Sequence, residues 1–123
     1  MKRAFKTKPF VRWMQKTELT EDLLKNAVKE MSEGLVNADL GGGLIKKRIA
    51  LPGRGKRGGV RTIIATNKDD RWFFLHGFEK ADKSNISQLD EDALKLIGSK
   101  FLRMDDASLA TAIIDGELWE ITL

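Results

Sequence analysis

The chain has 123 residues, of which 41% are hydrophobic and 33% charged, and its formal net charge is +4. This length and composition suit one folded domain over residues 1–123 and argue against intrinsic disorder. The absence of cysteine excludes a disulfide framework and thiolate chemistry, and the absence of a long apolar run and of a signal peptide favours a cytoplasmic protein without a membrane span.

The N-terminal third predicts a short strand followed by a helix. Residues 3–7 suit the strand, and residues 10–14 form an apolar cluster whose secondary structure the pattern leaves open. Thr20 suits an N-cap because acids occupy the next two positions, and apolar residues then recur at helical spacing up to Gly34. We therefore predict a helix from about residue 21 to the glycine.

The middle of the chain alternates apolar and polar residues, which is typical of half-buried strands. We predict strands over residues 44–51, 60–66 and 72–78, with a Gly/Pro loop over residues 52–59 between the first two. Because the connections are short, the three strands are expected to form an antiparallel meander.

The C-terminal third returns to a helical pattern. Ser87 with Asp90 resembles a capping box, and an apolar stripe at helical spacing continues to Phe101. Asp105 or Asp106 is a plausible cap for a short helix through residue 113, and alternating apolar residues over 119–123 predict a last strand.

Positive charge is concentrated in residues 41–61, which hold seven basic residues, seven of the eleven glycines and no acid. Residues 1–87 together carry 19 bases and 10 acids, whereas residues 88–123 carry three bases and eight acids. Such an asymmetry is a weak indication of a polyanionic partner such as nucleic acid, and many basic proteins carry it for solubility alone.

Strand periodicity places the charges on faces. Side chains two apart share a face, so Lys46 and Arg48 are expected opposite Lys47. The same parity groups Trp72, Phe74, His76, Phe78 and Lys80 on one face of the third strand. If Arg48, Arg61 and Lys80 share a face, three strands form a cationic floor beside aromatic rings, which suits single-stranded RNA or DNA. The alternative is that Phe74 and Phe78 are core residues.

Several enzyme signatures are excluded. Gly53, Gly55 and Gly58 match a dinucleotide fingerprint formally, but they precede a strand instead of a helix. A nucleotide P-loop is excluded because Ala50 and Arg57 stand where that motif needs a glycine and a hydroxyl. A metal centre lacks ligands, and the single histidine, His76, is more often structural than catalytic in mid-strand.

Three motifs and a final pair match a known family in chain order over about half the chain. They are LGGGLIKKRI from Leu40 to Ile49, GKxGGxRTII from Gly55 to Ile64, FFLxGFxK from Phe73 to Lys80, and Asn85-Ile86. In these residues the chain resembles the HigB-like branch of the RelE/ParE toxins of bacterial toxin–antitoxin pairs. Over residues 104–123 only the predicted elements match, and no motif does.

The resemblance implies a compact α+β domain with a mainly antiparallel, twisted sheet flanked by helices. It also implies an endonuclease that cuts mRNA in the decoding site of the 30S subunit and so inhibits translation. In that family the ribose 2′-hydroxyl attacks the adjacent phosphate without a metal or cofactor. The expected partner is an antitoxin with a helix-turn-helix domain, through which alone promoter DNA would be bound.

The resemblance also assigns roles to basic residues. Arg61 would stabilise the phosphate, Lys56 would hold the backbone or act as base, and Lys80 would be the acid or a second cation. Phe78 would stack on a base. Further RNA contacts are expected from Lys46, Arg48, Arg54, Arg57 and Lys83. Crowded cations suit such chemistry because neighbouring positive charges lower the pKa of a lysine.

Two other functions remain open on the sequence. A ParE-like inhibitor would bind gyrase with the same fold and do no chemistry, and a generic RNA-binding domain would bind many RNAs without cleaving them. A nuclease, unlike either, requires Lys56, Arg61 and Lys80 to converge on one phosphate.

Overall fold

A computed structural model describes residues 1–53, 55–79 and 86–123, with the backbone alone for residues 55–57. Helices and strands alternate irregularly along the chain, and their bounds are as follows: β1 (Arg3–Thr7), α1 (Lys8–Met14), α2 (Glu21–Ser32), β2 (Ala38–Gly41), β3 (Leu44–Leu51), β4 (Gly55–Thr66), β5 (Arg71–Glu79), α3 (Gln88–Leu102), α4 (Asp106–Ile114) and β6 (Leu118–Ile121).

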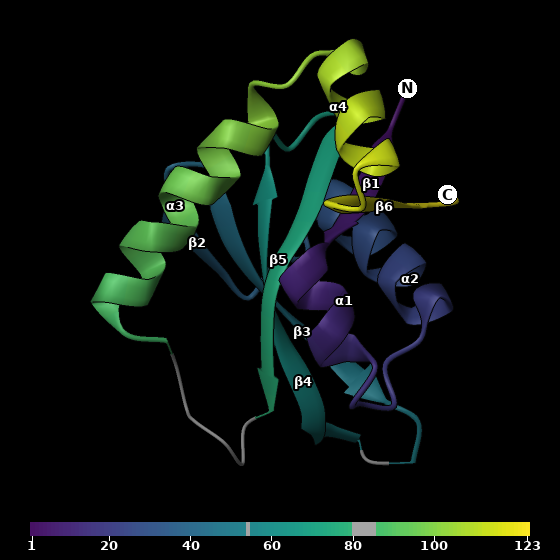
Figure 1. Cartoon of the computed structure of the whole chain (residues 1–123). Coiled ribbons are helices and arrows are strands. Elements are labelled where there is room, and N and C mark those ends of the chain that lie inside the picture. The colour runs from purple at the N-terminus through teal and green to yellow at the C-terminus, as the bar shows by residue number, and fades with distance from the viewer. Residues whose placement is uncertain (54, 80–85) are drawn as a thin grey trace.

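In the described residues the strands form one sheet in the order β2-β3-β4-β5-β1-β6. Every neighbouring pair is antiparallel except β1 and β5, which are parallel. This is the predicted α+β fold with a mainly antiparallel sheet, and the meander of β3, β4 and β5 is confirmed at its centre. Helices α1 and α2 cover one face, and α3 and α4 cover the other (Figure 1).

Each face of the sheet has its own apolar core. On the α1/α2 face, the first core contains Phe10, Leu24 and Phe74, and these three side chains are fully buried. On the α3/α4 face, Phe73 lies between Phe5 and Phe101, with ring centroids 5.0 and 5.3 Å apart. A sheet buried on both faces holds its strands rigidly, which suits a site that requires fixed side chains.

The predicted helix starts are confirmed at atomic detail. The Thr20 hydroxyl accepts a hydrogen bond from the Leu23 N–H at 3.3 Å, and the Ser87 hydroxyl accepts one from the Asp90 N–H at 3.1 Å. Both residues satisfy N–H groups that a helix leaves without an intrahelical partner, which explains where α2 and α3 begin.

Four elements differ from the predictions. The last strand, expected over 119–123, is β6 over Leu118–Ile121, and its buried residues are Leu118 and Ile121, whereas Trp119 is 39% exposed. The apolar cluster that the pattern left open belongs to α1, which begins beside Pro9, a residue preset for the first turn. β2 was missed because a four-residue strand beside three glycines has almost no periodicity. β4 begins at Gly55, so the predicted loop over 52–59 is too long. The prediction missed the start of β4 because residues 55–59 lack an apolar alternation, which the backbone pairing of β3 with β4 does not require.

Asp105 caps α4, because its Oδ1 accepts a hydrogen bond from the Ser108 N–H at 2.8 Å. That bond lowers the pKa of Asp105 below its ordinary value. Because the pKa of Asp105 is lower in the folded than in the unfolded protein, the ionised carboxylate stabilises the fold at any pH above the unfolded pKa of about 4. This stabilisation is lost as the pH falls through the folded pKa and the carboxylate is protonated. We expect Asp105→Ala to lower the free energy of unfolding at pH 7, and to lower it by less at acidic pH.

Urea unfolding of wild type and variant between pH 7 and pH 2.5 measures this difference. Asp115→Ala is the matched control, because Asp115 lies at the C-terminal end of the same helix, where the helix dipole disfavours a carboxylate. A pH-independent loss in Asp105→Ala, or an equal loss in Asp115→Ala, contradicts the capping role.

Candidate active site

Arg48 and Arg61, two of the three cations of the predicted floor, share the α3 face of β3 and β4, while the third, Lys80, lies outside the described residues. Arg48 pairs with Arg61, and Arg61 pairs with Phe78 on the next strand. Two residues further along each strand, a second row of paired residues consists of Lys46 on β3, Ile63 on β4 and His76 on β5. Directly opposed residues of neighbouring strands share a face, so both rows point to the same side of the sheet. We call the side chains of Lys46, Arg48, Arg61, His76 and Phe78 the cationic floor.

A β-bulge corrects the predicted parity of β5. The register with β4 shifts between Ile63 and Ile64, where Leu75 is the additional residue. Trp72 and Phe74 therefore belong to the core on the α1/α2 face, and the prediction that they share a face with His76 and Phe78 is wrong. One additional residue in a strand exchanges the faces of all the side chains that follow it. A prediction that assumes strict alternation along the strand cannot detect such a bulge.

Arg48 and Arg61 are held in the closest arrangement that an antiparallel sheet provides. The Asn37 Oδ1 accepts a hydrogen bond from the Arg48 N–H at 2.6 Å, so the backbone of Arg48 faces away from β4. The pair with Arg61 is therefore not hydrogen-bonded, and in such pairs the Cα atoms lie about 4.5 Å apart with the side chains close together. Two like charges in this position repel each other, and an anion between them relieves the repulsion.

Arg61 is a buried cation whose hydrogen bonding is incomplete. It is only 9% exposed, and within the described part of the chain its buried Nη1 has no hydrogen-bond partner. Burial lowers the pKa of Arg61 below its ordinary value, and the nearby charge of Arg48 lowers it further. An arginine nevertheless stays protonated at neutral pH. A buried guanidinium with an unused donor is a preformed site for a phosphate or carboxylate oxygen.

The two lysines of β3 lie on opposite faces, as the alternation predicts. Lys46 is half-buried on the cationic floor. Lys47 points to α2, where its Nζ lies 3.0 Å from the Glu30 carboxylate and donates to the Leu35 carbonyl at 2.8 Å. Lys47 therefore ties α2 to the sheet and takes no part in the floor. A lysine with this structural role cannot be distinguished from its neighbours by charge alone.

The aromatic part of the floor is buried. Phe78 is 3% exposed, and its ring centroid lies 5.9 Å from that of the half-buried His76. As the ring lies here, it packs among the floor side chains. A base-stacking role for Phe78 stays a prediction that would need the ring to be uncovered.

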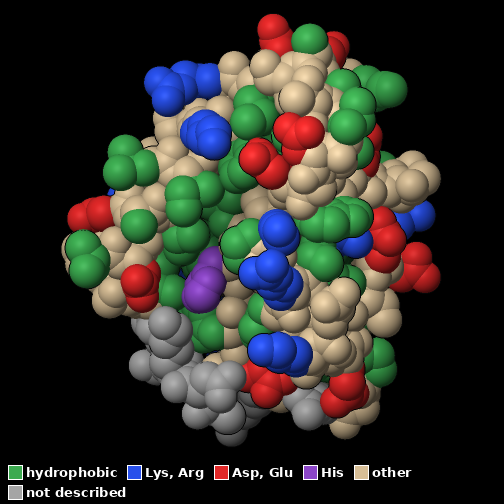
Figure 2. Space-filling model, viewed as in Figure 1, with side chains coloured by type: hydrophobic (Ala, Val, Ile, Leu, Met, Phe, Trp, Pro, Cys, Tyr) green, Lys and Arg blue, Asp and Glu red, His purple; other side chains and the backbone are tan. Residues whose placement is uncertain are grey.

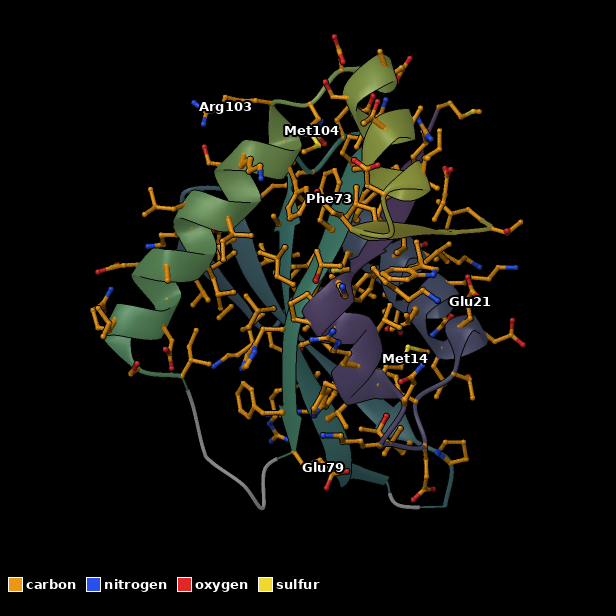
Figure 3. The ribbon with its side chains drawn as sticks, in the orientation of Figure 1. Met14, Glu21, Phe73, Glu79, Arg103 and Met104 are labelled. Carbon is orange, nitrogen blue, oxygen red and sulfur yellow. The ribbon has the colours of Figure 1, made fainter. Side chains whose placement is uncertain are left out.

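Other predicted site residues cannot be placed. Arg54, Lys80 and Lys83 lie outside the described residues, as do the side chains of Lys56 and Arg57. The neighbouring segments are placed: β5 ends at Glu79, one residue before the predicted acid, and α3 begins at Gln88 (Figure 3). The last described residue before the segment, Glu79, follows Phe78 of the cationic floor directly.

The cationic floor offers an anion the buried guanidinium of Arg61 and the exposed guanidinium of Arg48. No group of three or more His, Asp or Glu side chains suited to a metal ion is present in residues 1–53, 55–79 and 86–123. In the same residues no helix is long and apolar enough to cross a bilayer. The chemistry that these residues support best is electrostatic stabilisation of a phosphate.

A family model described as the RelE toxin of the RelE/RelB toxin–antitoxin system matches residues 2–121, which is nearly the whole chain. No curated protein matches significantly.

Proposed function

Because the chain belongs to the RelE toxin family and is thus the toxin of a toxin–antitoxin pair, we propose that it is a metal-independent mRNA endonuclease that acts on the ribosome and inhibits translation. Its partners would then be mRNA in the decoding site of the 30S subunit and an antitoxin with a helix-turn-helix domain, in the cytoplasm. The HigB-like branch stays a prediction from the motifs.

The observation that supports this proposal is the opposed pair of Arg48 and Arg61, in which the buried Arg61 guanidinium has a donor without a partner among the described residues. In a cleavage by 2′-hydroxyl attack, negative charge grows on the non-bridging phosphate oxygens. Arg61 would donate to these oxygens, and Arg48 would add a second positive charge from the exposed side. A cation that is already in position stabilises the transition state without first having to reorient. The stabilisation is larger in a site that excludes water.

The proton transfers require two further groups. A base takes the proton from the 2′-hydroxyl as its oxygen bonds to phosphorus, and an acid gives a proton to the 5′-oxygen as its bond to phosphorus breaks. The products are a 2′,3′-cyclic phosphate and a free 5′-hydroxyl. We assign Lys56 as the base or a backbone contact and Lys80 as the acid or second cation. Lys46, Arg54, Arg57 and Lys83 would bind neighbouring phosphates.

Toe-printing of a translated message tests the function. Purified protein is added to ribosomes stalled on a defined mRNA, and the same mRNA without ribosomes is treated in parallel. We expect cuts within the codon in the decoding site, absent from free mRNA and unaffected by EDTA at concentrations that leave the ribosome intact. If the folded protein makes no cuts but prevents gyrase from supercoiling DNA, the result would instead support a ParE-like inhibitor.

A further inference from the structure

Arg48 lies at a weak point of the sheet. The pairing of β2 with β3 runs from Leu44 to Lys46, so Arg48 stands two residues beyond its end. Just past Arg48, the register of β3 with β4 shifts between Ile49 and Leu51. A strand that has lost its outer neighbour and contains an irregularity is poorly supported. An exposed cation on such a strand needs a separate hold if it is to keep a fixed position.

Asn37 supplies this hold from the outer side of β3. Its backbone N–H donates to the Lys46 carbonyl at 3.0 Å, and its Oδ1 accepts a hydrogen bond from the Arg48 N–H at 2.6 Å. A side-chain carbonyl can take the place of a backbone carbonyl in this way. One residue therefore continues the pairing of the sheet past the end of β2 and reaches the backbone of Arg48.

The segment that contains Asn37 is itself fixed to the sheet. The Lys47 Nζ donates to the Leu35 carbonyl at 2.8 Å and lies 3.0 Å from the Glu30 carboxylate. The Leu35 N–H donates to the Glu30 carbonyl at 2.9 Å, so the end of α2 belongs to the same unit. The basic run 46–48 is thus bonded to residues 35–37 through a carbonyl, an ammonium group and an N–H. Asn37 is anchored on both sides of the group that it holds.

The hold on Arg48 opposes a force that the site itself creates. Arg48 and Arg61 are directly opposed, and like charges in this position push the two strands apart. Figure 2 shows His76, the single histidine, in a hollow of the surface, so the cationic floor is open to solvent and an anion can reach it. Until an anion arrives, a bond on the outer side of β3 keeps Arg48 from moving away from Arg61.

We propose that Asn37 is a positioning residue of the anion site formed by Arg48 and Arg61. Its side chain holds Arg48 opposite Arg61, so that both guanidinium groups meet the same phosphate. That this phosphate is the scissile one of an mRNA rests on the proposed nuclease, whereas the holding of Arg48 does not.

Asn37→Ala tests the role in cleavage. We expect single-turnover cleavage on saturating ribosomes to fall by about tenfold, because a displaced group loses its contact in the transition state. Affinity for the ribosome should stay within about twofold. In an Arg48→Met background, Asn37→Ala should cost less than about twofold, since no guanidinium is left to position. Asn37→Asp keeps the acceptor oxygen and should recover most of the rate at a salt concentration that screens its charge.

Asn67→Ala is the matched control. Asn67 is also an exposed asparagine, and its Oδ1 accepts hydrogen bonds from the N–H groups of Asp69, Asp70 and Arg71 at 3.0 to 3.1 Å. It lies in the turn after β4, beyond the end of the strand that carries Arg61. This variant should unfold at lower urea but cleave within about twofold of wild type. Equal losses of cleavage in the two variants, or an additive loss in the Arg48→Met background, overturn the proposal.

A second measurement needs no cleavage. Inorganic pyrophosphate is titrated into the protein while NMR follows the side-chain N–H signals of Arg48 and Arg61 and the exchange of the Arg48 amide hydrogen. Asn37→Ala should bind pyrophosphate about fivefold more weakly and exchange the Arg48 amide about tenfold faster, whereas Asn67→Ala should change neither. Unchanged exchange and binding in Asn37→Ala overturn the proposal. If the wild type makes no cuts, the proposed nuclease is wrong, and these signals still decide the role of Asn37.

Discussion

Arg61→Met is expected to lose cleavage of ribosome-bound mRNA by about 10²- to 10³-fold, the cost typical of removing one transition-state hydrogen-bond donor. Methionine keeps much of the length of the side chain and its apolar stem, so the packing of the site changes little. What is lost is the buried guanidinium that would donate to the non-bridging oxygens. Single-turnover cleavage on stalled ribosomes measures the loss directly.

The same substitution should not destabilise the protein. In the wild type the guanidinium is 9% exposed, opposes Arg48 and leaves a buried donor unused among the described residues. Replacing a poorly compensated buried charge by an apolar side chain is often neutral or stabilising. We expect the free energy of unfolding to be unchanged or to rise by about 1 kcal/mol, as at sites where function opposes stability.

Arg103→Ala controls for net charge, because Arg103 is an exposed arginine at the far end of α3 from the cationic floor (Figure 3). It should retain both cleavage and stability. Full cleavage by Arg61→Met would remove Arg61 from the mechanism. A large drop in stability would show instead that the guanidinium is structural.

The sequence predicted the elements that rest on local chemistry. Thr20 and Ser87 cap helices because a hydroxyl can satisfy free N–H groups next to it in the chain, and that signal is local. The periodicity grouped Lys46 with Arg48 and Arg61 with Ile63, but it left open whether Arg48 and Arg61 share a face, because parity within a strand does not fix the register between two strands.

Features that depend on distant partners were not predictable. The bulge at Leu75 is set by how β5 fits β4, and it decides that Phe74 faces α1 and His76 faces α3. Lys47 is buried because Glu30, on a helix far away in sequence, lies across from it.

Gly59→Ala is the second substitution with a large expected effect, and it connects the glycine-rich segment to the site. A Cβ built at Gly59 would lie 2.3 Å from the Ile49 carbonyl oxygen and 3.0 Å from the Ala50 Cα. These are backbone atoms of β3, so no side-chain rotation relieves the contact, and β3 must separate from β4. The strands can approach this closely only because residue 59 has no side chain.

We expect Gly59→Ala to lower the free energy of unfolding by about 3 kcal/mol, because the new methyl group overlaps the backbone of β3. Alanine also makes the unfolded chain less flexible, but that stabilises the protein by only a few tenths to about 1 kcal/mol. Gly77→Ala is the informative comparison. Its Cβ would lie 2.2 Å from the ring of Trp13, which is a side chain, so Trp13→Val should recover stability in the double variant.

No side-chain truncation should recover Gly59→Ala, and Ile49→Val in particular should leave its loss unchanged, because the oxygen in contact remains. Cleavage should fall as well, since Arg61 lies two residues beyond Gly59 on the same strand and its distance to Arg48 depends on the spacing of β3 and β4. Urea unfolding of the single and double variants distinguishes the backbone contact at Gly59 from the side-chain contact at Gly77. Normal stability of Gly59→Ala would mean that β4 can shift at this point, and the fixed spacing of the two arginines would no longer explain their chemistry.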